Sequence, residues 1–255
     1  MAEYIERKAM NILIACEESQ RVCIAFRNKG HNAFSCDILP CSGGHPEWHI
    51  QDDVLKILNP STHKVLTTRT GDDNGVEVWQ GVTFHTMDGK LHIIKGKWDL
   101  IIAHPPCTRL CNSGQRWLYW GDEEYRAKKK KEQEEAIKFF MQFVSADCDK
   151  IAIENPMGIM SSLYRKPDCT YNPYDFKDET ECKKTGLWLK SLEHLKPTRE
   201  IPLPKSERTQ GIWKAHFGDK KLAWNDPETS RLRSQTPVGV AKAMAEQWGV
   251  KQWLN

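Results

Sequence analysis

Four short apolar segments constrain the fold of this chain more than any other feature. They span residues 11–16, 32–36, 98–103 and 151–153, and each is bounded by polar residues or proline. Runs of this length are typical of buried strands. Between the first two, residues 19–29 place apolar side chains at helical spacing, and Gly30 is a natural helix end. Strands that alternate with a helix in this way predict a mostly parallel sheet.

Further segments complete the predicted layout. Residues 122–146 form a long helix with a polar first half, and residues 238–248 form a shorter one. Residues 62–97 carry turn signals between alternating segments, which predicts an inserted β-hairpin or meander. Residues 160–230 are rich in proline and charge and predict a small irregular C-terminal subdomain. We therefore predict a single α/β domain over residues 1–255, with a Rossmann-like, mostly parallel sheet and a β-hairpin insertion.

Composition narrows the class of protein. Of the 255 residues, 39% are hydrophobic and 28% charged, which is usual for a soluble globular protein, and no apolar run is long enough to span a membrane. The first residues lack the apolar core of a signal peptide, so we expect the nine cysteines to be reduced thiols. This predicts a cytoplasmic protein, in a bacterium or a phage-infected host. A net charge of +3 is compatible with a nucleic-acid partner without requiring one.

Two of the predicted strands end in reactive side chains. Residues 98–103 lead into His104-Pro105-Pro106-Cys107-Thr108, and residues 151–153 lead into Glu154-Asn155-Pro156. Proline fixes the backbone and cannot extend a strand ladder, so the thiol of Cys107 is held outside the sheet. Ligand sites in open α/β sheets lie at the carboxyl ends of the strands. We therefore predict that Cys107 and Glu154 form one site, which combines a nucleophile with a proton donor.

These two motifs resemble those of the DNA cytosine-5 methyltransferases. The matching residues are Pro106-Cys107-Thr108 and Glu154-Asn155-Pro156. The chain looks closest to a compact branch of that superfamily, common in phage and mobile elements, in which the second motif ends in proline. The resemblance covers most of the chain except residues 62–97. It implies the class I methyltransferase fold, S-adenosylmethionine as cofactor and DNA as substrate.

The resemblance also implies roles for the motif residues. Cys107, as a thiolate, would add to carbon 6 of cytosine, while Glu154 would hold or protonate ring nitrogen 3. Asn155 would position that carboxylate or the nearby backbone. A cytosine in duplex DNA would have to leave the base stack to reach the thiol. Pro106 and Thr108 would face the substrate and Pro105 the cofactor, and the sequence does not identify the base that removes the carbon-5 proton.

The predicted cofactor turn departs from the family pattern. A glycine-rich turn is expected after the first strand, but the chain reads Cys16-Glu17-Glu18-Ser19-Gln20. We expect Cys16, Glu17 and Ser19 to bind the cofactor, with the helix-start amides available and Ser19 capping the helix. One of the two glutamates would face the cofactor's ammonium or sulfonium group. Asp37 matches the acid that binds ribose hydroxyls and Asp53 the acid that meets the adenine amine, although both could also be strand-end or helix-capping aspartates.

The C-terminal third carries weaker matches. Residues 236–248 resemble the last motif of the family, which completes the cofactor pocket. Residues 183–189 take the place of an arginine-containing strand motif, with Lys184 in the arginine position, where lysine supplies a point charge. Arg231 and Arg233 are candidate phosphate contacts. Methyltransferases that read a DNA site carry a sizeable recognition domain, and residues 160–230 would have to take its place here. This predicts one of three alternatives: relaxed target selection, a contribution from residues 62–97, or a substrate other than a long duplex.

Two other functions stay open on the sequence. One is a nucleic-acid-binding relative that has lost methyl transfer and acts in phage–host conflict, which the glycine-free turn favours. The other is an enzyme that modifies free pyrimidine nucleotides or delivers a different group. The spacing of Cys36, Cys41, His45 and His49 resembles a zinc site, but we interpret it as a turn-rich loop and predict no metal.

Overall fold

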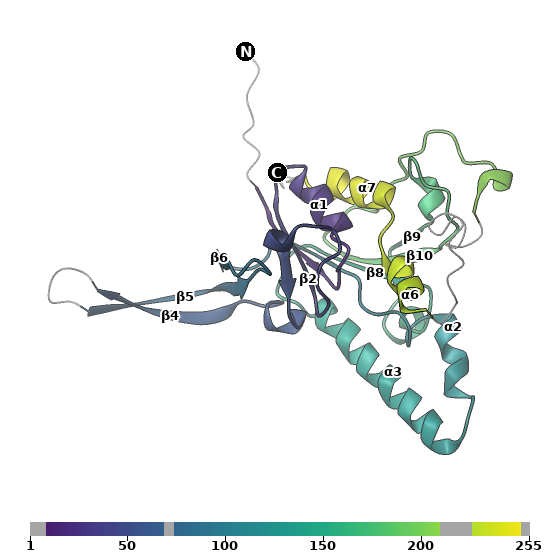
Figure 1. The fold of residues 1–255 in the computed structure, drawn as a ribbon, viewed down its shortest axis with the longest axis horizontal. Coiled ribbons are helices and arrows are strands. Elements are labelled where there is room, and N and C mark those ends of the chain that lie inside the picture. Colours follow the sequence, from purple (N-terminus) through teal and green to yellow (C-terminus); the bar gives the residue numbers. More distant parts are fainter. Residues whose placement is uncertain (1–8, 69–73, 210–225, 251–255) are drawn as a thin grey trace, which may run out of the picture.

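A seven-stranded sheet forms the centre of the protein (Figure 1). The computed structural model describes residues 9–68, 74–209 and 226–250. The strand order is β3-β2-β1-β7-β8-β10-β9. The strands are β1 (Asn11–Ala15), β2 (Asn32–Asp37), β3 (His49–Gln51), β7 (Leu100–Ala103), β8 (Ile151–Pro156), β9 (Cys169–Tyr171) and β10 (Thr185–Lys190). The first five in this order run parallel, whereas β10 is antiparallel to both β8 and β9. The predicted α/β fold with a mostly parallel, Rossmann-like sheet is therefore confirmed.

The strand order reverses between β1 and β7. From β1 the chain moves outward to β2 and β3, and it later returns to β7 on the other side of β1 and continues to β8. Ile14 of β1 accordingly pairs with Ser35 of β2 and with Ile102 of β7. Connections that leave two adjacent strands in opposite directions open a crevice at their carboxyl ends. That edge of the sheet is where the predicted reactive residues lie.

Helices cover both faces of the sheet. Helices α1 (Arg21–Arg27) and α7 (Val238–Trp248) lie together on one face, and α3 (Glu123–Val144) lies on the other (Figure 1). Because side chains of a strand alternate between its faces, Ile12 and Ile14 pack with the first pair of helices, while Leu13 packs on the α3 side. This arrangement buries the apolar segments found in the sequence on both sides of the sheet.

The predicted β insertion is present as a three-stranded antiparallel sheet. It consists of β4 (Ser61–Thr68), β5 (Asn74–His85) and β6 (Leu91–Lys95), and β4 and β5 form a ribbon that projects from the body (Figure 1). Its base is anchored by aromatic packing: the rings of Phe34 and Phe84 lie 5.0 Å apart, and Trp98 stacks on Phe84 at 5.7 Å. The insertion therefore shares the core of the main sheet at its base.

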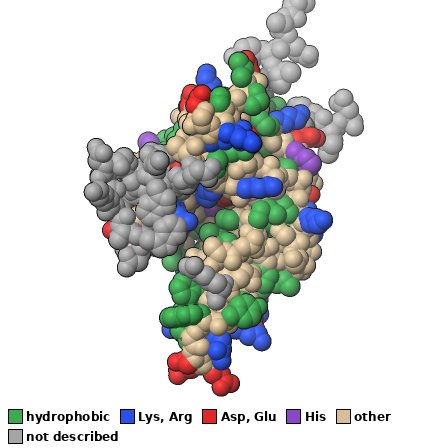
Figure 2. Space-filling model, turned by 90° about the vertical axis from the view of Figure 1, so that its right-hand side faces the viewer, with side chains coloured by type: hydrophobic (Ala, Val, Ile, Leu, Met, Phe, Trp, Pro, Cys, Tyr) green, Lys and Arg blue, Asp and Glu red, His purple; other side chains and the backbone are tan. Residues whose placement is uncertain are grey.

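The second half of α3 carries the packing that holds this helix on the sheet. Asp122 caps its start by accepting a hydrogen bond from the amide of Tyr125, and the residues around that end are exposed. Figure 2 shows acidic side chains gathered at this lower end of the molecule. In the second half, Phe140 is fully buried with its ring 5.4 Å from that of Trp188. The polar and apolar halves of the predicted helix thus have different surroundings.

The segment 160–230 contributes to the main sheet through β9 and β10. It also holds α4 (Met160–Leu163), and it ends within α6 (Pro227–Ser234), which lies before α7. Residues 210–225 of this segment lie outside the described residues. A further short helix, α2 (Asn112–Gln115), lies between β7 and α3. None of the helices in the described ranges is both long and apolar enough to cross a bilayer.

Replacing Phe140 by alanine should lower the free energy of unfolding by about 3–5 kcal/mol, because it removes a buried ring and leaves a cavity beside Trp188. The exposed neighbour Lys138 provides the control, and Lys138→Ala should change stability by no more than about 0.5 kcal/mol. Urea unfolding followed by tryptophan fluorescence measures both. Equal effects of the two substitutions would contradict the packing of this half of α3 against the sheet.

Candidate active site

Parallel pairing of β7 and β8 brings the two predicted motifs together. Ala103, the last residue of β7, pairs with Ile153 of β8, so the residues that follow these two lie at the same edge of the sheet. The side-chain amide of Asn155 donates a hydrogen bond to the carbonyl of Pro105 over 2.8 Å, which ties one motif to the other. Glu154 lies close enough for its charge to act on Cys107. Cys107, Glu154 and Asn155 are therefore neighbours, as the sequence predicted.

Cys107 shares its surroundings with a second thiol. The amides of Leu110 and Cys111 both donate to the carbonyl of Cys107 over 2.9 Å, which forms a helical turn with Cys111 on the same side. The hydrogen bond between the two thiols, together with burial, raises the pKa of Cys107, whereas the same bond lowers the pKa of Cys111 to about 5. The two thiols thus titrate as one coupled pair, and the proton in the contact between them has to shift from Cys107 toward Cys111 before Cys107 attacks.

Glu154 is a buried carboxylate with several polar partners. It is 9% exposed, and its Oε2 lies 2.8 Å from Nδ1 of His104. Burial by itself would raise the pKa of Glu154, but the hydrogen bond from His104 and the nearby charge of Lys183 outweigh it and leave the pKa below its usual value. The hydroxyl of Thr185 also contacts the carboxylate. Because an ionised carboxylate only accepts hydrogen bonds, Nδ1 of His104 must be the donor.

Sequence reasoning missed several residues of this site. Lys184, predicted in the arginine position, is exposed, and it is Lys183 whose charge acts on both Cys107 and Glu154. Cys111 had a usable signal, because a spacing of four places two residues on one side of a helical turn. His104 also had one, since it stands directly before the double proline. Further partners of the carboxylate are Tyr171 and Thr185, which only strand pairing brings close.

The predicted cofactor turn has an unusual backbone. Cys16 and Gln20 have φ angles of 59° and 58°, a left-handed conformation that glycine adopts most readily. The carboxylate of Glu17 accepts hydrogen bonds from the amides of Val22 over 2.7 Å and Cys23 over 3.2 Å. The expectation that these helix-start amides stay available was therefore wrong. The helix begins after Gln20 without a side-chain cap there, so the predicted cap by Ser19 is replaced by Glu17.

Acidic side chains gather at the carboxyl ends of β1 and β2. Burial, followed by the charges of Asp37, Cys36 and Asp53, raises the pKa of Cys16, so these groups lie around one thiol. Burial also raises the pKa of Asp37, which accepts a hydrogen bond from the amide of Leu39. Asp53 accepts from the amide of Leu55 and caps a 3₁₀ turn over Val54–Lys56. The cofactor-side acids of the prediction are thus brought together, and Asp53 also has a capping role.

The predicted substrate residues take different positions. Pro106 and Thr108 are exposed at the rim, whereas Pro105 is buried. Arg231 binds Glu228 through two contacts and lies 3.6 Å from Glu18, so it faces the cofactor turn. Arg233 is exposed, and its carbonyl accepts a hydrogen bond from Lys183.

The C-terminal helix also reaches the cofactor side. The guanidinium of Arg21 in α1 donates to the carbonyl of Thr236 and to the side chain of Gln235. Since α7 begins just after these residues, the bonds fix α7 beside α1, close to the turn that follows β1. Residues 236–248, the segment compared with the last family motif, therefore lie beside α1.

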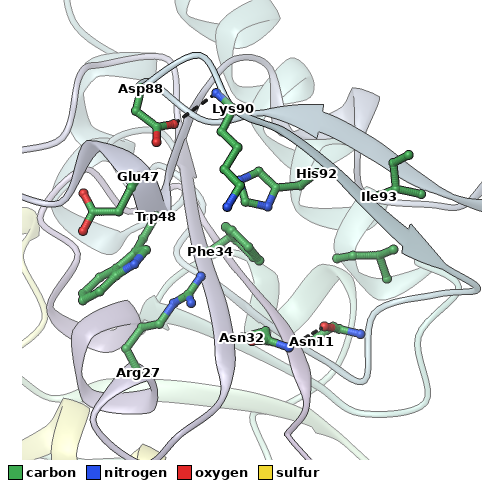
Figure 3. Close-up of a pocket in the computed structure, with 11 residues that line it drawn as sticks. Asn11, Arg27, Asn32, Phe34, Glu47, Trp48, Asp88, Lys90, His92 and Ile93 are labelled. Carbon is green, nitrogen blue, oxygen red and sulfur yellow. Dashed lines mark hydrogen bonds between the residues drawn. The ribbon is translucent and has the colours of Figure 1, made fainter.

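A separate pocket lies at the other edge of the sheet. It has a volume of about 410 Å³ and is lined by the amino ends of β1 and β2, where Asn11 and Asn32 lie, and by the β6 hairpin (Figure 3). The guanidinium of Arg27 stacks there on Phe34 at 4.6 Å and on Trp48 at 5.1 Å. The pocket shares no lining residue with the site around Cys107.

No protein-family model matches this chain, and a comparison with curated proteins likewise gives no match. Function therefore has to be inferred from the site itself. The site combines a pair of thiols after β7 with a buried carboxylate on β8. An acidic turn follows the neighbouring strand β1. Such a site can combine nucleophilic attack with proton transfer.

Cys111 should react with iodoacetamide at about pH 6.5, because its pKa of about 5 makes it mostly a thiolate at that pH, whereas an ordinary thiol is protonated there. Trypsin cleaves after Arg109, so mass spectrometry of the digest reports Cys107 and Cys111 in separate peptides. Buried Cys36, whose pKa is raised to about 12, should remain unmodified. In Cys107→Ala the donor to Cys111 is missing, and labelling of Cys111 should fall. Unchanged labelling in that variant would rule out the shared proton.

Proposed function

We propose that this protein is an S-adenosylmethionine-dependent DNA cytosine carbon-5 methyltransferase of the compact phage type. The observation that carries the proposal is the position of Cys107 and Glu154 at the ends of adjacent parallel strands, with Asn155 bonded across to Pro105. Attack on a pyrimidine needs a nucleophile at carbon 6 and a proton donor at nitrogen 3 of the same ring. A thiol and a carboxylate on neighbouring strand ends meet that requirement.

Cys107 acts as the nucleophile in this proposal. Its proton passes to the thiolate of Cys111, and the freed electron pair forms the bond between sulfur and carbon 6 of cytosine. The nearby charge of Lys183 favours the thiolate form of Cys107, while the charge of Glu154 opposes it. Once carbon 5 carries the methyl group and a water molecule has taken up its proton, the same bond would break and restore the thiolate.

Glu154 binds the opposite edge of the ring. Attack at carbon 6 pushes electron density toward nitrogen 3, which takes up a proton, and the carboxylate is placed to deliver that proton or to hold it in a hydrogen bond. Asn155 fixes the loop that carries the nucleophile through its bond to Pro105. Pro106 and Thr108, exposed beside the thiol, would contact the nucleotide around the base.

The residues of the acidic turn fit S-adenosylmethionine. That molecule carries a sulfonium, an ammonium and one carboxylate, so its net charge is positive. Glu18 is buried, and its Oε1 lies 3.6 Å from the guanidinium of Arg231 without a hydrogen bond, so the ammonium group or the sulfonium would share this carboxylate with Arg231. Asp37 ends β2 at the position that suits ribose hydroxyls. When bound, the cofactor supplies an electrophilic methyl group.

A variant with serine at position 107 should lose methyl transfer and retain its fold, because a hydroxyl in this position is a far weaker nucleophile than a thiolate. The wild type should form a detergent-resistant adduct with a mixed-sequence duplex that contains 5-fluorocytosine, since fluorine blocks the release of the enzyme. Gel electrophoresis detects the adduct. Cys169→Ser, at a partly exposed thiol on β9, is the matched control and should form the adduct normally. An adduct that persists in Cys107→Ser would disprove the mechanism.

Asp37→Asn should weaken the binding of S-adenosylmethionine by roughly tenfold to a hundredfold, because hydrogen bonds to a charged group contribute about 1.5–3 kcal/mol. Isothermal titration calorimetry measures the change. Asp147→Asn is the control: this exposed carboxylate lies 3.3 Å from Lys97, away from the turn after β1, so its loss should leave affinity unchanged. Equal effects of both substitutions would count against a specific role for Asp37.

A binding protein without methyl transfer is the second candidate function. It is favoured by the carboxylate of Glu17, which occupies the helix-start amides that an anionic group of a ligand could otherwise use. Calorimetry separates the two functions, because the binding protein would give no heat with S-adenosylmethionine at high concentration. Mass spectrometry of treated DNA against treated free nucleotide tests whether the substrate is the polymer.

A further inference from the structure

His104 lies between the two halves of the site. It follows β7 directly, and its amide donates to the carbonyl of Ala15 at the end of β1 over 2.9 Å. Its side chain is 8% exposed and donates from Nδ1 to Glu154. On the other side stands Glu17, whose pKa is raised by burial and lowered in part by the charge of His104. Nε2 of His104 is buried and has no hydrogen-bond partner among the described residues.

Glu154 needs a source for the proton that it would give to nitrogen 3 of cytosine. Its hydrogen bonds and the charge of Lys183 hold it as a carboxylate, so it has no proton of its own to give to nitrogen 3. Of the groups that contact it, Thr185 is a hydroxyl that does not ionise in the physiological range. Burial raises the pKa of Tyr171 well above the usual value of a phenol, so Tyr171 is a poor proton donor. Among these partners, histidine is the side chain that exchanges a proton near neutral pH.

We propose that His104 supplies, through Glu154, the proton that cytosine nitrogen 3 receives when Cys107 attacks carbon 6. The inference rests on the proposed methyltransferase function and deepens it. His104 is a positioning residue in this scheme, because it acts through Glu154 and does not touch the base. The 2.8 Å contact places the imidazole directly on the carboxylate, and both side chains are largely buried.

The proton balance of this step is complete within the site. The imidazolium of His104 gives the proton on Nδ1 to Oε2 of Glu154, and the carboxyl group gives a proton to nitrogen 3. The electron pair of the Cys107 thiolate forms the sulfur–carbon bond at the same time. His104 is left neutral and Glu154 ionised. When the bond to sulfur breaks at the end of the cycle, the proton returns from nitrogen 3 by the same route.

Charged groups around the pair set its pH dependence. Glu17 faces His104 from the turn after β1, and Glu154 faces it from β8. Lys183, ahead of β10, and Tyr171, on β9, act on Glu154. Because the proposed relay needs a proton on Nδ1 that His104 can release, kcat should fall on the alkaline side of the pH profile.

The test is His104→Asn, because the asparagine amide can occupy the place of Nδ1 and keep a donor toward Glu154, yet it cannot release a proton. We expect kcat for methyl transfer to DNA to fall by about 10²-fold or more. The alkaline limb of the kcat profile should disappear, whereas KM for DNA should change little. Formation of the covalent adduct with 5-fluorocytosine DNA should slow by the same factor.

Controls separate this role from a structural one. The thermal midpoint of His104→Asn and its affinity for S-adenosylmethionine, measured by calorimetry, should match the wild type. His104→Gln serves as a second variant, since its longer amide reaches toward the Nε2 position; it should also lack the alkaline limb. Wild-type kcat with an unchanged alkaline limb in either folded variant would overturn the inference.

Failure of the inference and failure of the proposed function give different results. If the wild type methylates DNA and Glu154→Gln is inactive, but His104→Asn behaves as the wild type, only the role of His104 is wrong. If the wild type forms no adduct with 5-fluorocytosine DNA and transfers no methyl group at any pH, the methyltransferase proposal is wrong, and the proton route is refuted with it.

Discussion

Parallel pairing between β7 and β8 puts the carboxyl ends of both strands at one edge of the sheet. The ladder that joins Ala103 to Ile153 fixes the level at which the Cys107 loop and Glu154 leave the sheet. Antiparallel pairing of β10 with β8 then carries Thr185 alongside, and β9 adds Tyr171 through Thr185. Every polar group around the carboxylate reaches it through this chain of strand pairs, so a shift in one register would dismantle the site.

Burial makes the polar contacts of this site strongly interdependent. A carboxylate taken out of water without partners would be costly and would stay protonated, but Glu154 has a short bond from His104 and the charge of Lys183 nearby. A hydrogen bond also stabilises the ionised form in the thiol pair, where the contact with Cys107 lowers the pKa of Cys111. The protein thus holds a coupled thiol pair and an ionised carboxylate near each other before any substrate arrives, and a preorganised site of this kind avoids rearrangement during reaction.

The turn after β1 shows how a chain can keep a tight loop without glycine. Cys16 and Gln20 adopt the left-handed conformation themselves, and Glu17 satisfies the first amides of α1 from within. Strained backbone of this kind persists where the surroundings fix it, and here the side-chain amide of Gln20 donates to the carbonyl of His45 and accepts from its amide. The result is an acidic turn, which is suited to a ligand of positive net charge.

Much of the fold and part of the site could be predicted from local pattern. Apolar runs, glycine and proline determined the strands, the long helix and the β insertion, and the double proline identified Cys107 as a thiol outside the sheet, because these signals act within a few residues. The partners of the reactive groups could not be predicted in this way. His104 and Glu154 are 50 positions apart, Lys183 replaces its neighbour Lys184, and the amides of α1 are taken by Glu17. Only the tertiary structure decided these contacts, since they depend on which strands become neighbours and on how burial changes the charge of each group.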